Sequence, residues 1–579
     1  MAVEIAVERP RPVPQGRARP DGLALACTVL LVVVAFLVLY PLLLLAINSF
    51  RVGEFGREAV WGLDNWRIAL SQPRMRSALE NTFTLALTRQ AIATVIGILL
   101  AWLLARTNLP GRNWLELGFW FALLLPNLPV LMGWILLLDG HYGVLINALR
   151  AIPLFAGLTF DIFSWWGIVV AHLVITLIPL KVFLLTPAFR NLDAALEEAA
   201  YVHGASTLRT LCQVVVPLLA PTILAITLLG FIRSIQSFEI ELVLGGAAGI
   251  DIYSTLIYRE VSQSPPRYGT ATALSMLIVL VMIPLIVLQQ GIVHGRSYTT
   301  VSGKYTGRRY QLGPLRWPLF GLVVALLVFI LVVPVAFMFL SSFMKVFGVF
   351  DVPDPWTTNH WQRILSDPLL LRAIGNTLLL GAGTTVVSVA LFTVIAYVSV
   401  RVRFFGRRLL DFLTWLPSTV PGIVLSLGLL WLFLSTPLFR PLYGTVWILI
   451  IALSISGMTL GVQLIRAGLL QLGAELEEAS WVAGGGRLYT LTRVLLPLIA
   501  PTIAVVALQS FATAVSAVSL IALLGSAHNK PLALLQLEYL DTGLFEPASV
   551  VGILIFGLTV GTALLARVIA LRAGLGRVG

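Results

Sequence analysis

The chain has 579 residues, of which 58% are hydrophobic and 11% are charged. A soluble domain carries about 25% charged residues, so this chain has too little polar surface for a soluble protein of its size. The formal net charge of +12 does not require a nucleic-acid partner, because the cytoplasmic loops of membrane proteins collect Lys and Arg. Composition therefore indicates a membrane protein surrounded by lipid and disfavours a nucleic-acid function.

Apolar runs of about 20 residues, long enough to cross the hydrocarbon core as helices, recur along the chain. Helices are expected because every backbone group must be hydrogen-bonded inside lipid. The twelve predicted spans are 23–48, 80–105, 114–138, 165–187, 217–243, 270–292, 317–342, 374–400, 409–434, 444–469, 497–523 and 548–570. The first run is too long for a cleaved signal peptide. The sequence thus predicts an all-α membrane protein with about 12 transmembrane helices.

Basic residues gather in two of the connecting segments. The clusters are Arg296, Lys304, Arg308, Arg309 and Arg316 between spans six and seven, and Arg401, Arg403, Arg407 and Arg408 between spans eight and nine. Because Lys and Arg favour the cytoplasmic side, we expect both clusters and the N-terminus to be cytoplasmic.

The second half of the chain repeats the first. "LEEAAYVHGASTLRTLCQVVVPLLAPTI" at 196–223 aligns without a gap with "LEEASWVAGGGRLYTLTRVLLPLIAPTI" at 476–503, and 16 of the 28 residues are identical. "NTFTLALTRQ" at Asn81 also aligns with "NTLLLGAGTT" at Asn376, and Tyr142–Gly143 aligns with Tyr443–Gly444. The offset between the copies falls from 301 at the Tyr-Gly pair to 280 at the long repeat, so the first half carries 21 extra residues, around 151–167.

Each repeat holds six spans, so both halves are expected to enter the membrane in the same direction, as parallel repeats around a central path. The expected organisation is a cytoplasmic tail at 1–20, a six-helix repeat at 21–295, a basic cytoplasmic linker at 296–316 and a second six-helix repeat at 317–579.

The long repeated segment predicts a short helix, a turn and a second helix at the cytoplasmic face. Glu197 and Glu198 suit the first turn of a helix, and Gly204 can adopt the left-handed backbone that ends one. Pro217 and Pro221 then open the next span. A single loop of this kind is most simply an amphipathic connector, whereas two matched copies favour contact with a dimeric partner.

The pattern Glu-Ala-Ala, three residues, Gly and a Pro-containing apolar segment resembles the EAA loop of permeases from bacterial ABC importers that depend on a binding protein. The double length, with "AWLLARTNLPGR" and "YGTVWILI", is most similar to the ferric-iron permeases. The resemblance implies that both loops are coupling helices that dock on a dimer of ATP-binding subunits. It assigns this role to Glu197, Glu198, Ala199, Ala200 and Gly204, and to Glu477, Glu478, Ala479 and Gly484, while Ser480 departs from the pattern.

No phosphate-binding loop of the GxxxxGK[ST] type occurs in the sequence, so ATP hydrolysis is expected on a separate subunit. The outer loops are short to medium in length, which implies a separate soluble receptor for the solute, and the resemblance implies that this receptor is a periplasmic solute-binding protein. The resemblance further implies a multi-pass protein of the bacterial inner membrane that is not itself an enzyme. We expect no catalytic residue, cofactor or metal site.

Four charged residues in or near the spans are candidates for a solute path: Lys181, Arg233, Glu239 and Glu241. Charges inside a membrane usually face the bundle interior or a cavity. The structural alternative is that they pair, for example Arg233 with Glu239, or extend their charged ends to the membrane interface. For His172 we expect a packing role.

The interpretation favoured by these features is the permease of an ATP-driven importer, with ferric iron as the expected solute. The same machinery could carry a polyamine, thiamine or 2-aminoethylphosphonate, because the repeated loop does not select the solute. An ion-coupled secondary transporter would use intramembrane carboxylates and would not need the doubled loop. A membrane-embedded enzyme lacks support, since no cluster of catalytic residues is found near the inner face.

Overall fold

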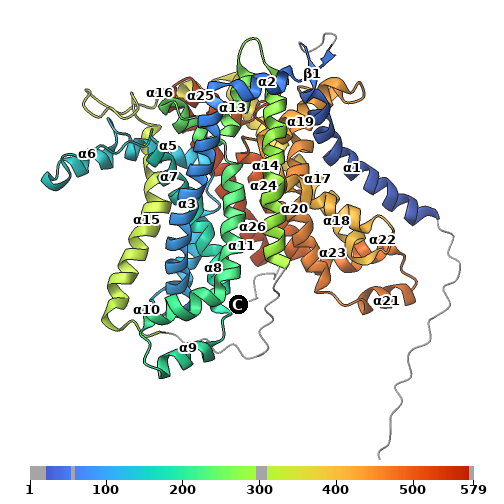
Figure 1. Ribbon diagram of the computed structural model, residues 1–579, viewed down its shortest axis with the longest axis horizontal. Coiled ribbons are helices and arrows are strands. Elements are labelled where there is room, and N and C mark those ends of the chain that lie inside the picture. The colour runs from blue at the N-terminus through green and yellow to red at the C-terminus, as the bar shows by residue number, and fades with distance from the viewer. Residues whose placement is uncertain (1–20, 54–58, 295–309, 573–579) are drawn as a thin grey trace, which may run out of the picture.

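The computed structural model describes residues 21–53, 59–294 and 310–572, and the described chain is almost entirely helical (Figure 1). Strands β1 (Arg51–Val52) and β2 (Val60–Trp61) form one short antiparallel pair. The helices of the first half are α1 (Asp21–Ser49), α2 (Asp64–Ser71), α3 (Pro73–Arg106), α4 (Arg112–Ala122), α5 (Asn127–Leu138), α6 (Val144–Arg150), α7 (Trp165–His172), α8 (Ile178–Arg190), α9 (Ala194–Val202), α10 (Thr207–Thr210), α11 (Val216–Ile235), α12 (Gly246–Ala248), α13 (Tyr253–Ser262) and α14 (Tyr268–His294).

The second half has a corresponding series. Its helices are α15 (Arg316–Ser341), α16 (Asn359–Leu365), α17 (Pro368–Arg401), α18 (Arg407–Trp415), α19 (Gly422–Ser435), α20 (Val446–Leu470), α21 (Glu475–Val482), α22 (Arg487–Tyr489), α23 (Leu496–Leu498), α24 (Ala500–Ser516), α25 (Leu532–Asp541) and α26 (Phe545–Arg572). Short 3₁₀ or π-helical turns are η1 (Pro153–Phe155), η2 (Leu173–Leu177), η3 (Leu211–Val215), η4 (Glu241–Gly245), η5 (Gly313–Leu315), η6 (Leu416–Thr419), η7 (Arg440–Leu442) and η8 (Thr490–Leu495).

In the described residues, nine helices are long and apolar enough to cross a membrane, or up to twelve if each sharply bent pair counts as one span. The three bent pairs match the third, ninth and eleventh predicted spans, with bends of 102°, 113° and 80°. The prediction of an all-α protein with about 12 spans is therefore confirmed.

Two predicted spans end earlier than expected. The fifth was expected to reach residue 243 and the eleventh residue 523, but α11 ends at Ile235 and α24 at Ser516. In the first case Ser237 Oγ donates to the Ser234 carbonyl at 2.7 Å, a local side-chain bond that competes with helix continuation. Apolar residues alternate with polar ones after Ile235 and predominate after Ser516, which is why the predicted spans were extended.

The two halves share their internal construction. α3 and α17 are both 34 residues long and begin at a proline. Near their starts, the Thr82 hydroxyl accepts a bond from Tyr253 N at 2.9 Å, and the Thr377 hydroxyl accepts one from Leu532 N at 2.8 Å. These bonds fix the starts of α13 and α25 and explain why "NT" recurs in the sequence.

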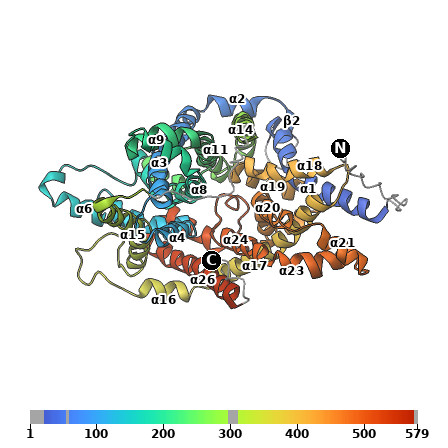
Figure 2. The same ribbon diagram turned by 90° about the horizontal axis from the view of Figure 1, so that it is seen from below.

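The first helix of each half packs against the other half. α1 lies along α18 and α19, and α15 lies along α4 and α5 (Figure 2). The helix backbones approach closely at two glycines. A Cβ added to Gly133 would lie 1.8 Å from the carbonyl oxygen of Pro334, and a Cβ added to Gly428 would lie 3.0 Å from the carbonyl oxygen of Pro41. Glycine at these positions therefore permits the exchange of first helices that joins the repeats.

The end of the predicted linker is attached to the first half. Tyr310 N donates to the Arg106 carbonyl at 2.8 Å, and Leu312 N donates to Asn108 Oδ1 at 2.9 Å. The expected tail at 1–20 and the basic residues Arg296, Lys304, Arg308 and Arg309 lie outside the described residues.

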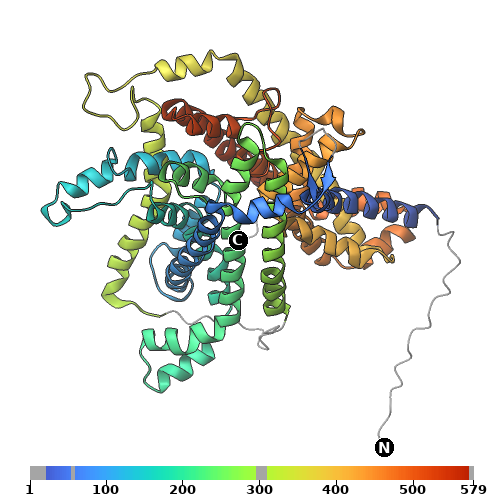
Figure 3. The ribbon, with the colours of Figure 1, turned by 45° about the horizontal axis from the view of Figure 1, so that its top comes forward.

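The extra residues of the first half belong to an arm that projects sideways from the bundle and carries α6 (Figure 3). Its base is closed where Ile162 N donates to the Leu138 carbonyl at 3.1 Å and Gly140 N donates to Asp161 Oδ1 at 3.1 Å. The insertion therefore extends a loop between α5 and α7 without disturbing the repeated bundle.

Candidate functional site

The two repeated loops form short helices, α9 and α21, at the same end of the bundle (Figure 1). Gly204 and Gly484 follow them with φ of +78° and +85°. The next residues close the helices in the same way, with Ala205 N donating to the Ala200 carbonyl at 3.1 Å and Gly485 N to the Ser480 carbonyl at 2.8 Å. Both loops thus have the glycine-dependent ending that the sequence predicted.

The first Glu of each loop is buried. Glu197 forms an ion pair with Arg106, the last residue of α3, with Oε2 2.6 Å from Nη2. Glu477 pairs in the same way with Arg401, the last residue of α17, with Oε1 2.6 Å from Nε. These carboxylates attach the loops to the bundle and are too buried to touch a partner directly. The coupling role expected for Glu197 and Glu477 stays a prediction.

The second Glu of each loop, Glu198 or Glu478, is exposed, as is the Ala that follows it. Ala200 and Ser480 are half-buried, and Ser480 Oγ lies 2.8 Å from Thr490 Oγ1. The serine that departs from the repeated pattern is therefore accommodated by a bond within its own loop.

Sequence reasoning missed the apolar residues at the outermost part of each loop. Val202 is 83% exposed and Val482 is 91% exposed. We define the apolar tips as Tyr201, Val202 and Leu208 in one loop and Trp481, Val482 and Leu488 in the other, all of which are exposed. Their signal in the sequence is the recurrence of aromatic-Val directly before the turn. Two equal patches of this kind suit contact with another protein.

A cavity of about 720 Å³ lies between the halves. It is lined by residues of α11 and α14 from the first half and of α17, α20 and α24 from the second. Five glutamines contribute to its polar wall: Gln236, Gln289, Gln290, Gln463 and Gln509. A cavity at the boundary of parallel repeats, with polar side chains in its wall, is the geometry expected for a translocation path.

Two of the four candidate path residues line this cavity, Arg233 and Glu239. The carboxylate of Glu239 accepts a bond from Asn127 Nδ2 at 3.3 Å. The alternative ion pair between Arg233 and Glu239 is not among the ion pairs found in the described chain. Lys181 lies elsewhere, buried between helices with Nζ 3.3 Å from the Ile226 carbonyl oxygen.

Glu241 lies behind the cavity wall. Its Oε1 is 2.7 Å from Arg89 Nη1, 2.9 Å from His172 Nε2 and 2.5 Å from Ser237 Oγ. These partners neutralise and hold the carboxylate, and Glu241 is not among the residues that line the cavity. Pairing, the structural alternative, therefore describes Glu241 here, and its place on the path stays a prediction. The packing role expected for His172 agrees with its bond to Glu241.

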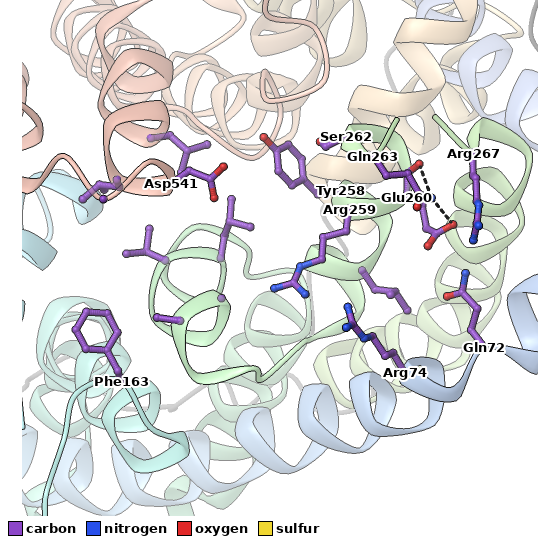
Figure 4. Close-up of a pocket in the computed structure, with 18 of the residues that line it drawn as sticks. Gln72, Arg74, Phe163, Tyr258, Arg259, Glu260, Ser262, Gln263, Arg267 and Asp541 are labelled. Atoms are coloured by element: carbon purple, nitrogen blue, oxygen red, sulfur yellow. Dashed lines mark hydrogen bonds between the residues drawn. The ribbon is translucent and has the colours of Figure 1, made fainter. Parts of the chain in front are cut away.

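A second cavity, of about 930 Å³, opens at the end of the bundle opposite α9 and α21. Figure 4 shows Arg74 and Arg259 pointing into it, with Asp541 of α25 across the opening. Arg259 Nη1 lies 3.2 Å from Asp251 Oδ2, and Arg74 Nη1 lies 4.0 Å from the same oxygen. We call this cavity the outer cleft. Its lining includes charged side chains of both halves, Arg74 and Arg259 from the first and Asp541 from the second.

Comparisons with known proteins agree with this arrangement. The family profile described as "Binding-protein-dependent transport system inner membrane component" matches residues 93–298 and 390–574. The chain is 30% identical over 518 residues to "Probable ABC transporter permease protein y4fN" of Sinorhizobium fredii, covering 87% of this chain and 88% of the relative. It is 28% identical to "Ferric transport system permease protein FbpB" of Actinobacillus pleuropneumoniae, covering 90% and 74%. It is 24% identical to "Fe(3+)-transport system permease protein FbpB 2" of Haemophilus influenzae, covering 83% and 87%.

Proposed function

Because this chain belongs to the family of binding-protein-dependent transport system inner membrane components, we propose that a separate dimer of ATP-binding subunits drives it to import ferric iron. The observation that carries the proposal is the pair of matched loops at one end of the bundle, each with a buried Glu, an exposed Glu and an apolar tip. Two equivalent contacts are what a symmetric dimer would offer.

The attachment of the loops supports their role in coupling. Each loop is joined by an ion pair to the end of a 34-residue helix, α3 or α17. Movement of the partner subunits would therefore pass directly into α3, which packs against α8 and α11, and into α17, which packs against α20 and α24. Rigid-body rocking of the halves around the central cavity would expose that cavity to each side in turn.

The proposed orientation places α9 and α21 in the cytoplasm. Arg401 lies beside α21, and Arg403, Arg407 and Arg408 follow it, so positive charge gathers at that end as cytoplasmic segments require. The outer cleft then faces the periplasm, where a solute-binding protein would dock and release its solute. In this orientation the N-terminus is cytoplasmic.

Ferric iron is proposed as the solute because two of the named relatives are ferric permeases that align with most of this chain. The repeated loops do not distinguish iron from a polyamine, thiamine or 2-aminoethylphosphonate. Selection of the solute is assigned to the binding protein.

The test is reconstitution of the full chain in vesicles with its cognate ATP-binding subunit and exported binding protein. We expect radioactive iron to accumulate only when ATP is present on the side of α9 and α21. An ionophore that collapses ion gradients should leave the accumulation unchanged. Uptake that needs a gradient and no ATP would contradict the importer mechanism, and ATP-driven uptake of another solute alone would contradict only the assignment of iron.

A further inference from the structure

Arg233 is an unusual residue in the central cavity. It lies near the end of α11, is exposed, and lines the cavity between the halves. Within the described residues it makes no hydrogen bond or ion pair. A charge placed inside a membrane protein without a protein partner is costly and is usually retained for function.

The other ionisable groups of the cavity wall are engaged by the protein itself. The cavity-lining residues that can carry charge are His172, Arg233 and Glu239. His172 is bonded to Glu241, which also pairs with Arg89. Glu239 accepts the amide of Asn127. Arg233 is therefore the one charged group of this wall that has no partner among the described residues.

The residues that follow α11, from Gln236 to Glu239, are held at the boundary of the halves. Gln236 Nε2, one turn after Arg233, donates to the Ser418 carbonyl of the second half at 3.3 Å. Glu239 lies three residues after Gln236, so its carboxylate lines the cavity close to this bond between the halves. Arg233 comes before this junction, in the last turn of α11, and remains available to a solute.

The second half does not reproduce this charge. At the offset of 280 residues, Thr513 corresponds to Arg233 and Ser519 corresponds to Glu239, and both line the cavity. The positive charge is thus a property of one side of the path. It attracts anions and opposes the entry of a bare multivalent cation.

We propose that the solute passes through the cavity with an anionic group against the guanidinium of Arg233. This inference rests on the proposed function. For iron, the group is an anionic oxygen ligand in a ferric complex, and for another solute it is a free oxyanion. Both sources present carboxylate-like or phosphate-like oxygens, which accept charge-assisted hydrogen bonds from a cationic side chain.

The experiment uses the reconstituted importer with wild-type chain, Arg233→Gln and Arg233→Lys. Arg372→Gln is the matched control, because Arg372 is an exposed arginine of α17 that does not line the cavity. Radioactive iron supplied as ferric citrate is offered in one arm, and radioactive molybdate in the other. ATP hydrolysis stimulated by the binding protein is measured in the same vesicles, because it reports subunit coupling independently of solute passage.

We expect R233Q to lower solute uptake by about tenfold or more, as loss of a bond between charged groups would do, while stimulated ATP hydrolysis is retained. R233K should recover part of the uptake, and R372Q should match the wild type. Uptake in the iron arm identifies a ferric complex, and uptake in the molybdate arm identifies a free oxyanion.

Wild-type uptake by R233Q would overturn this inference and leave the proposed function intact. R233K as inactive as R233Q would also overturn it, because the positive charge would then not be the property that matters. Uptake by the wild type in neither arm would overturn the inference together with the assignment of iron.

Discussion

Neighbouring carboxylates in this chain have opposite environments. Glu197 is buried against Arg106 and Glu198 is exposed, while Glu239 lines the cavity and Glu241 is bound behind its wall. Adjacent residues of a helix point about 100° apart, so the sequence can indicate that two neighbouring Glu residues differ. It could not indicate which one is buried, because Arg106 and Arg89 are distant in the chain.

Glu197→Gln should destabilise the chain and loosen its loop. Breaking a buried ion pair leaves Arg106 without its counter-charge and costs about 3–5 kcal/mol. The matched control is Glu198→Gln on the exposed side of the same helix, which should leave stability unchanged. The two variants are compared by their thermal unfolding midpoints in detergent and by their rates of limited proteolysis around residue 200. Equal effects of the two substitutions would refute the anchoring role of Glu197.

The second half has uncharged residues at all three positions that correspond to the buried cluster of Arg89, His172 and Glu241. Arg89, His172 and Glu241 correspond to Thr384, Ala452 and Ile521, at offsets of 295, 280 and 280. Such a coordinated difference suggests that the charges depend on one another. The sequence displays the three differences separately, and only the structure shows that they concern one site.

Replacing Glu241 alone with Ile should therefore destabilise the chain by about 3–5 kcal/mol, because Arg89 remains buried without its partner. The triple variant Arg89→Thr, His172→Ala and Glu241→Ile should be more stable than E241I, although it has more substitutions. Thermal unfolding midpoints of the three proteins measure this order. A triple variant that unfolds below E241I would show that the residues act independently.

At the scale of elements, most spans could be predicted because a helix in lipid needs a long apolar run. The sharp bends in three spans were not visible in hydropathy, since both arms of each bent pair are apolar. The ends of α11 and α24 were misplaced for the same reason. The loop helices were predicted well because Glu, Gly and Pro each have a defined position at helix ends.

Gly484 provides a test of the loop geometry. Gly484→Ala should destabilise the end of α21 by about 1–2 kcal/mol, because a Cβ is disfavoured in the left-handed region. The control is Gly486→Ala, since Gly486 has φ of −72° and an added Cβ meets nothing within 4 Å at either position. Hydrogen exchange over residues 475–490 measures the difference. Equal exchange in the two variants would show that the left-handed turn does not control the loop.

At the scale of the whole molecule, the even number of spans per repeat predicted parallel halves, and the two loops do lie at one end (Figure 1). The exchange of α1 and α15 between halves could not be predicted, because it depends on close approach at Gly133 and Gly428 and not on hydropathy. The central cavity follows from the same arrangement of the halves. Its residues come from many helices and loops of both halves that are far apart in the sequence, so no local motif could have marked it.

The most direct test of the account is the amount of ATP-binding subunit that co-purifies with Val202→Asp, Val482→Asp and the double variant. Each single substitution places a charge in one apolar tip, so each should lose part of the bound subunit, and the double variant should lose nearly all of it. The control is Leu438→Asp, an exposed apolar residue outside both tips, which should bind as the wild type does. A double variant that retains the full complement of ATP-binding subunits would contradict the claim that the paired loops hold the subunits that drive transport.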